Sequence, residues 1–140
     1  RTAFGKKFVW WIKDQLDIKL MNEAAILFPV LKDYQYFSDD SQEQQSTMVE
    51  IKHVTVNDFG DMIVFHVVGS HFIWKQVRRM TGVLIEAGRG KLSNEEIATF
   101  FKHRSDIPSK LTAPPSGLFL ERVYYKNEEI NFNIKPVINI

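Results

Sequence analysis

The residues best suited to chemistry in this sequence are three cations in one short stretch, Lys75, Arg78 and Arg79. Lysine and arginine side chains bind phosphate groups and pair with carboxylates. The formal net charge is only +1, so any basic surface must come from such local clustering rather than from total charge. On spacing alone, a solvated helix face is the simpler interpretation of the three cations.

Histidines and carboxylates could supply a metal site or an acid–base pair, but their spacing indicates neither. His66 and His71 lie in or near a predicted strand, where single histidines usually pack against neighbours. No carboxylate or further histidine accompanies them at ligand spacing, so we expect no metal. The chain also has no cysteine, which excludes disulfides and thiolate metal ligands.

The three cations belong to a predicted helix around which the chain is organised. Arg78 lies at the shoulder of its apolar stripe, and Lys75 and Arg79 lie further round. Gly88 and Gly90 follow the helix, where a left-handed residue is needed. The apolar positions recur at steps of four and three and are Ile73, Val77, Met80, Leu84 and Ala87.

The elements before this helix are predicted from hydrophobic pattern and turn chemistry. Apolar residues spaced for one face of a helix lie within residues 16–31. Residues 38–46 are polar and acidic, which predicts a solvated loop. Residues 48–56 and 62–68 are rich in β-branched side chains, and 57–61 favour a turn, which predicts an antiparallel hairpin. Its second strand is apolar on both faces, so we expect it to be central and covered on both sides.

The elements after this helix are shorter. Ser93 and Glu96 form a predicted capping box, which begins a helix that runs to about His103. Residues 118–125 are the last predicted strand, opened by Gly117. The order helix, hairpin, helix, helix, strand predicts an α+β fold.

Length and composition limit the chain to one domain. At 140 residues and 44% apolar content, it can build one ordinary core. It contains no apolar run long enough to span a membrane and no signal peptide, so we expect a cytoplasmic protein with no membrane partner. The first residue is Arg1 rather than an initiator methionine, which indicates a fragment.

Two ordered motifs resemble the signature of the TruA-type tRNA pseudouridine synthases, and together they are far more specific than either alone. The family has Gly-x-x-Phe, then x-Val-Arg-x-x-x-Gly, then Val-Gly-x-Gly. The second motif, Ala-Pro-x-x-Gly-Leu-x-Leu-x-x-Val-x-Tyr, is similar to residues 113–125, and the whole resemblance covers about 21–125. The first motif is matched by Gly69, Phe72, Val77, Arg78, Gly82, Gly88 and Gly90, with Ala87 in place of Val.

The resemblance implies an isomerase that converts uridine to pseudouridine in tRNA without a metal or organic cofactor. In that family an Asp acts at the sugar–base unit, a Tyr packs on the flipped base, and an Arg or Lys pairs with the Asp. Arg78 falls on this catalytic cation position, and Leu118 falls on an apolar wall of the uracil pocket. The remaining expected contacts are Gly117 and Phe72 to the substrate, and Lys75, Arg79 and Arg89 to RNA.

The family's catalytic Asp motif, Arg-x-Asp-x-Gly-Val-His, and its later Tyr segment are absent from this chain. Both lie upstream of the region matched here. We therefore expect residues 1–140 to be a single domain, the C-terminal half of the catalytic domain, and inactive when isolated. A noncatalytic RNA-binding or docking domain on the same scaffold is the alternative.

The family's fold and assembly give further expectations. Members fold as a largely antiparallel sheet with helices packed on one face and the active-site cleft on the other. They pair as dimers and modify the anticodon stem-loop region of tRNA. The resemblance therefore implies half of such a cleft in this chain, tRNA as partner, and a homodimer of the parent protein.

Overall fold

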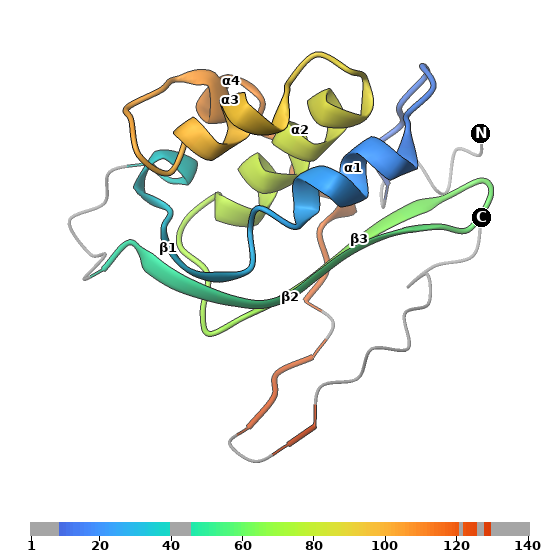
Figure 1. Cartoon of the computed structure of the whole chain (residues 1–140). Coiled ribbons are helices and arrows are strands. Elements are labelled where there is room, and N and C mark those ends of the chain that lie inside the picture. The colour runs from blue at the N-terminus through green and yellow to red at the C-terminus, as the bar shows by residue number, and fades with distance from the viewer. Residues whose placement is uncertain (1–8, 40–45, 121, 126–127, 130–140) are drawn as a thin grey trace.

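The computed structural model of this chain describes residues 9–39, 46–120, 122–125 and 128–129. Three antiparallel strands form one sheet in the order β1-β2-β3. The helices lie together on one face of this sheet (Figure 1), and the hydrophobic core lies between the two layers. The predicted α+β fold is confirmed. The strands are β1 (Val30–Asp33), β2 (Met48–Asp58) and β3 (Ile63–Gly69).

The predicted hairpin is confirmed as β2 and β3. Val56 pairs with Phe65, and Asp58 pairs with Ile63 at the end of the ladder. The turn beyond this pair needs a residue with positive φ, which Gly60 supplies at 87°. The Asp58 carboxylate accepts a hydrogen bond of 2.9 Å from the Gly60 amide and so closes the turn.

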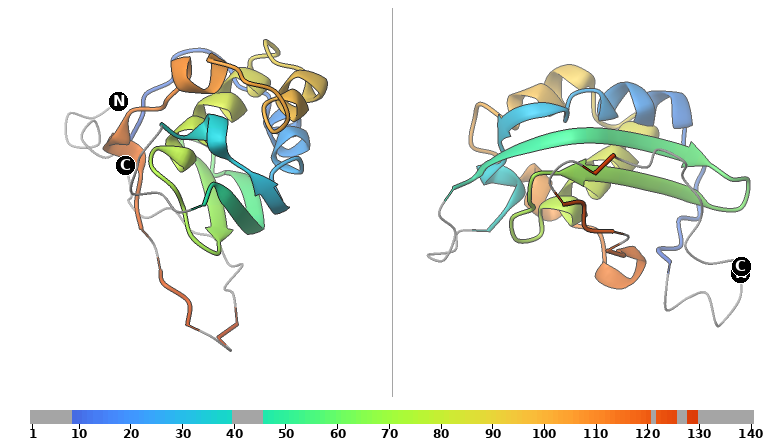
Figure 2. Two further views of the ribbon diagram at one scale, coloured as in Figure 1. Left: turned by 90° about the vertical axis from the view of Figure 1, so that its left-hand side faces the viewer. Right: turned by 90° about the horizontal axis from the view of Figure 1, so that it is seen from below.

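The expected burial of the second hairpin strand is wrong. Within the described residues, β2 is the middle strand and β3 pairs on one side only. No residue of β3 is fully buried. Phe65 and Val67 pack against the core, but the alternate side chains face the side of the sheet that carries no helix (Figure 2). Apolar residues on both faces of β3 are therefore not matched by a second covering layer among the described residues.

The first helix, α1 (Ile18–Ala25), is shorter than the predicted face over residues 16–31. The Asp17 side chain caps its N-terminus by accepting from the Leu20 amide at 3.2 Å. The buried side of α1 includes Met21, whereas Leu20 is exposed. Pro29 cannot continue a helix, and the chain beyond it turns into β1.

An aromatic cluster follows β1 and closes one end of the core. Tyr34 precedes the short 3-10 helix η2 (Gln35–Phe37), Phe37 ends it, and both are fully buried. The Tyr34 hydroxyl donates to the Phe28 carbonyl at 2.7 Å, and burial raises the pKa of Tyr34 above its ordinary value. The Phe37 ring also packs edge-on against Phe28, with ring centroids 5.9 Å apart.

The helix around which the chain is organised is α2 (Gln76–Gly88), as predicted. The predicted capping box of Ser93 and Glu96 is also present and begins α3 (Asn94–Thr99). This helix ends earlier than the expected His103, although Ile97 and Phe100 are buried. The short helix α4 (Ile107–Lys110) and the 3-10 turn η3 (Pro115–Gly117) complete the described elements.

The strand expected over residues 118–125 is absent from the part of that range that the structure describes. The segment extends below the sheet, away from the helices (Figures 1 and 2), and Leu120 is 83% exposed. A strand needs a neighbour for its backbone hydrogen bonds, and no described strand pairs with this segment. Most of the predicted acidic loop, residues 40–45, lies outside the described residues. No helix of the described chain is long and apolar enough to cross a bilayer.

Candidate functional site

The N-terminus of α2 is built by a tight connection from β3. The Ile73 amide donates to the side-chain oxygen of Gln76 at 3.0 Å, so the Gln76 side chain closes the turn before the helix. Gln76 is fully buried. Lys75 stands at the N-cap with φ of 63° and provides no side-chain cap. A left-handed conformation is uncommon for a residue with a Cβ atom, which marks this turn as constrained by its surroundings.

Arg78 lies in the first turns of α2 and is held by a neighbouring segment of chain. Its Nε donates to the Ala113 carbonyl at 2.7 Å, and the Ala113 amide donates back to the Arg78 carbonyl at 3.0 Å. Gly82 lets this segment approach α2 closely, because a Cβ atom there would lie 1.5 Å from the Leu111 carbonyl oxygen. Arg78 and Ala113 therefore fix each other's position.

The rest of the Arg78 guanidinium is not engaged by the described part of the chain. No Asp or Glu there forms an ion pair with Arg78, and the one hydrogen bond of its side chain uses Nε. The two terminal nitrogens form a planar fork of donors that matches a carboxylate. The Arg78 guanidinium is thus held through Nε, and its terminal nitrogens form no hydrogen bond or ion pair with the described residues.

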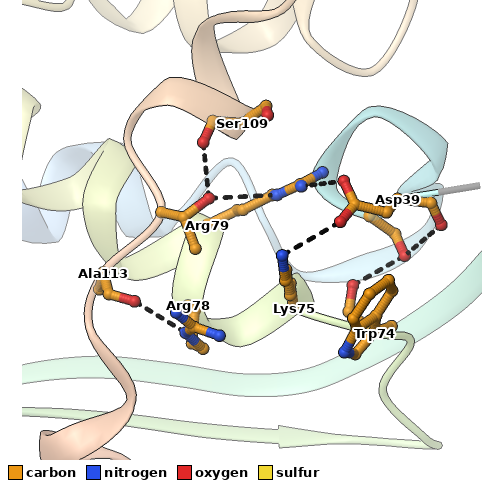
Figure 3. A network of polar contacts seen from close by, with 9 residues as sticks. Asp39, Trp74, Lys75, Arg78, Arg79, Ser109 and Ala113 are labelled. Carbon is orange, nitrogen blue, oxygen red and sulfur yellow. Dashed lines mark hydrogen bonds and ion pairs between the residues drawn. The ribbon is translucent and has the colours of Figure 1, made fainter.

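Arg79 does not lie where periodicity placed it. We expected it further round the helix from the apolar stripe, but its side chain is only 4% exposed. Its guanidinium forms an ion pair with Asp39, and its Nε donates to the Thr112 hydroxyl at 3.3 Å (Figure 3). A solvated helix face is therefore the wrong interpretation for this residue.

Asp39 is a functional candidate that the sequence patterns missed. Its carboxylate contacts both Arg79 and the Lys75 Nζ, the latter at 3.2 Å. Hydrogen bonding from Arg79, and next from Lys75, holds the pKa of Asp39 below its ordinary value. The preceding Ser38 hydroxyl donates to the Trp74 carbonyl at 2.7 Å. Segment 38–39 is thereby fastened to the start of α2 at two points.

Lys75 and Trp74 form the accessible edge of this cluster. The Lys75 side chain is 30% exposed, and its Nζ lies 4.7 Å from the centre of the Trp74 ring. Trp74 itself is 58% exposed. Figure 3 shows Trp74, Lys75 and Arg78 along the same side of the N-terminal turns of α2. An exposed cation and an exposed ring next to Arg78 suit a nucleic-acid surface.

Arg89 is not brought together with the other cations. It lies just past the opposite end of α2, about 16 Å along the helix from Arg78 at 1.5 Å per residue. It pairs with Asp14 at 2.7 Å and with Glu86 at 2.6 Å. Hydrogen bonding to Asp14, and then to Glu86, raises the pKa of Arg89. Its charge is thus already compensated within the chain.

The expected substrate-contacting residues lie on two segments next to α2. Phe72 precedes the helix, and its ring covers Gly69, where an added Cβ atom would lie 2.9 Å from the Phe72 Cε1. Gly117 ends η3, and Leu118 follows it with half of its surface exposed. The segment that carries Gly117 and Leu118 begins at Ala113, the residue that holds Arg78. One chain segment therefore links the cation to Leu118.

The histidines provide no metal site among the described residues, which contain no group of three or more metal-ligating side chains. His66 lies on β3 beside His53 of β2, with ring centroids 5.8 Å apart. Burial, and next the neighbouring His66, lowers the pKa of His53.

Comparison with known proteins gives one consistent result. A sequence model of the family described as tRNA pseudouridine synthase matches residues 24–126. Relatives named tRNA pseudouridine synthase A include one from Pelobacter propionicus, 32% identical over 125 residues, which span 89% of this chain and 51% of the relative.

Two further relatives of the same name show similar coverage. The protein from Geobacter sulfurreducens is 34% identical over 116 residues, spanning 83% of this chain and 48% of the relative. The protein from Thermodesulfovibrio yellowstonii is 35% identical over 140 residues, spanning 89% of this chain and 53% of the relative. The chain thus spans about half the length of the curated relatives that it matches.

Proposed function

Because this chain belongs to the tRNA pseudouridine synthase family, we propose that the protein containing it isomerises uridine to pseudouridine in tRNA. We assign residues 1–140 to one domain, the C-terminal half of the catalytic domain. Two observations support this assignment: the chain matches about half of each relative, and it lacks the family's Asp motif.

The proposed reaction balances within the nucleotide. The bond between uracil N1 and ribose C1′ breaks, and a bond between uracil C5 and C1′ forms. C5 loses a proton and N1 gains one, so no oxidant, reductant or organic cofactor takes part. The target base must leave the helical stack before these atoms become accessible.

Arg78 is the catalytic residue that this chain contributes, and its geometry is the observation that carries the proposal. A carboxylate enclosed with a base needs a fixed cation, because otherwise desolvation protonates it. Arg78 has its Nε bound to Ala113, and its terminal nitrogens have no carboxylate partner in the described part of the chain. In the proposal, the missing Asp from the other half accepts hydrogen bonds from these nitrogens.

The uracil pocket is proposed to use Leu118 as an apolar wall, with Gly117 and Phe72 beside it. Leu118 and Phe72 are both partly exposed in this chain. Gly117 has no side chain that would restrict a base placed against η3. An apolar wall adds no charge next to the reacting carboxylate, and it favours a base that has left the stack.

The proposed RNA surface is centred on Lys75, with Trp74 beside it. Among the three expected RNA contacts, Lys75 combines a partly exposed charge with a position close to Arg78. Arg89 stays a predicted contact at the far end of α2. Arg79 stays a prediction too, although its buried guanidinium favours a structural role. The anticodon stem-loop region as target, a homodimer of the parent protein and a cytoplasmic location belong to the same proposal.

The test is turnover by the full-length protein on tRNA that carries tritium at uracil C5. Isomerisation releases this tritium to water, because C5 loses its hydrogen. We expect release by the full-length protein. Binding of tRNA without any release would overturn the enzyme proposal and support a noncatalytic RNA-binding domain on the same scaffold.

A further inference from the structure

We propose that Asp39 is a positioning residue that acts through Arg79 to orient Arg78, an inference that rests on the function proposed above. Asp39 and Arg79 are 40 positions apart in the chain. Figure 3 shows their ion pair at the N-terminal turns of α2, with Lys75 and Arg78 beside it. Among the described residues no hydrogen bond or ion pair joins Arg78 to Asp39, so the proposed effect passes through intermediate groups.

The first step is the bridge formed by Arg79. On one side its guanidinium contacts Asp39. On the other side its Nε donates to the Thr112 hydroxyl at 3.3 Å, and this hydroxyl donates to the Ser109 carbonyl at 2.6 Å. A single buried side chain therefore connects segment 38–39 to the segment that follows α4.

The second step runs from Thr112 to Arg78. The next residue in the chain is Ala113, which exchanges two hydrogen bonds with Arg78, at 2.7 Å and 3.0 Å. The orientation of the Arg78 guanidinium thus depends on where Ala113 lies, and Ala113 is held in part by the contact between Arg79 and Thr112. A misplacement of about 1 Å in a catalytic group is enough to lower a rate by roughly a hundredfold.

The charge of Asp39 is what keeps Arg79 in this position. The Arg79 side chain is almost completely buried, and a cation removed from water needs an opposite charge. Without the carboxylate, the guanidinium gains by moving toward solvent and away from Thr112. Asp39 also pairs with Lys75, whose φ of 63° needs support from its surroundings. Asp39 therefore constrains the residues on both sides of Arg78.

The direct test measures hydrogen exchange at the Arg78 Nε–H by NMR in the full-length protein. The proton is protected by the Ala113 carbonyl, and we expect Asp39→Asn to speed its exchange by about tenfold, through local opening. Thr112→Val keeps the ion pair and removes only the hydroxyl, so it should act in the same direction. Asp106→Asn breaks an ion pair whose two side chains are 72% exposed and should change nothing. Unaltered exchange in Asp39→Asn would overturn the proposal.

The second test measures turnover of the same variants together with their thermal midpoints. We expect Asp39→Asn to lower kcat by about ten- to a hundredfold with little change in KM, and Asp39→Glu to recover part of it. When Arg78→Ala is already present, adding Asp39→Asn should lower kcat no further. A further fall of kcat by the same factor as in the single variant would overturn the proposal. If Asp39→Asn does not fold, the turnover and Arg78 exchange of Thr112→Val test the proposal instead. If Arg78→Ala is fully active, the proposed function is wrong. The exchange measurement still tests whether Asp39 orients the Arg78 side chain.

Discussion

Arg78 and Arg79 are adjacent, yet their guanidinium groups have different surroundings. Arg79 is buried between Asp39 and Thr112, and Arg78 is half-buried with one nitrogen on Ala113. Helical periodicity missed this difference because it treats every arginine as a polar, outward residue. The partner that draws Arg79 inward lies 40 positions upstream, beyond the reach of any local pattern. The family resemblance, in contrast, singled out Arg78 directly.

The Asp39 ion pair makes a prediction for the pH dependence of stability. Hydrogen bonding from Arg79 lowers the folded-state pKa of Asp39 below its ordinary value of 3.8. A lowered pKa means that the pair stabilises the fold above pH 3.8, and that this stabilisation is lost as the pH falls through the folded-state pKa. We expect Asp39→Asn to lower the thermal midpoint at neutral pH, and this difference to vanish in acid.

Thermal unfolding of both proteins across the acid range checks this prediction. Asp106→Asn is the matched control, since its ion pair with Lys110 is exposed on both sides and such pairs contribute little. A difference between wild type and Asp39→Asn that persists below the folded-state pKa of Asp39, where its carboxylate is protonated, would show that charge is not the cause.

At the scale of elements, Gly82 decides how closely segment 111–113 packs on α2. Replacing a helix-interior glycine by alanine normally stabilises a protein by about 1 kcal/mol. Here the new Cβ atom would overlap the Leu111 carbonyl oxygen, which belongs to the backbone. We therefore expect Gly82→Ala to destabilise the fold by roughly 1–3 kcal/mol, as overpacking does, measured by urea unfolding.

Gly88→Ala is the matched comparison in the same helix. Its Cβ atom would meet the Met21 side chain, 2.7 Å from Cγ, and this flexible side chain can move aside. Its loss of stability should therefore be smaller than that of Gly82→Ala. The opposite order, or a stabilising Gly82→Ala, would contradict the close packing described for segment 111–113.

Elements with a local signal were predicted well from the sequence. The hairpin turn at Gly60, the periodic helix α2 and the capping box of Ser93 and Glu96 all depend on residues near one another in the chain. Elements that depend on distant neighbours were not. Residues 118–125 have a strand-like pattern but no described strand to pair with. The apolar side chains on both faces of β3 are not matched by a second covering layer within the part of the chain that the structure describes.

At the scale of the molecule, the described helices cover one face of the sheet, and no described helix lies on the other face. The helices lie on one side of the sheet, and the segment after η3 extends beyond the other (Figure 2). Leu118, Leu120 and Tyr125 on that segment leave at least half of their surface exposed. This arrangement agrees with the proposed assignment of the chain as one half of the catalytic domain.

The isolated chain should therefore bind RNA without acting on it. We expect no tritium release from tRNA, because the catalytic Asp is absent. We also expect weak binding that falls as salt rises, since few cations release counterions from phosphate. Filter binding over a range of salt concentrations measures this slope. Turnover by the isolated chain would contradict its assignment as half of the catalytic domain. An RNA affinity that does not change with salt concentration would contradict a phosphate-contacting surface.

The most direct test of the central claim is the activity of Arg78→Ala in the full-length protein. The variant strands the proposed catalytic carboxylate without its cation, which raises the carboxylate's pKa and costs about 3–5 kcal/mol for a buried pair. We expect turnover to fall by two orders of magnitude or more, with fold and tRNA affinity largely kept, and Arg78→Lys to recover part of the loss. Arg104→Ala, an exposed arginine elsewhere on the chain, should match wild type. Wild-type turnover by Arg78→Ala would contradict the account.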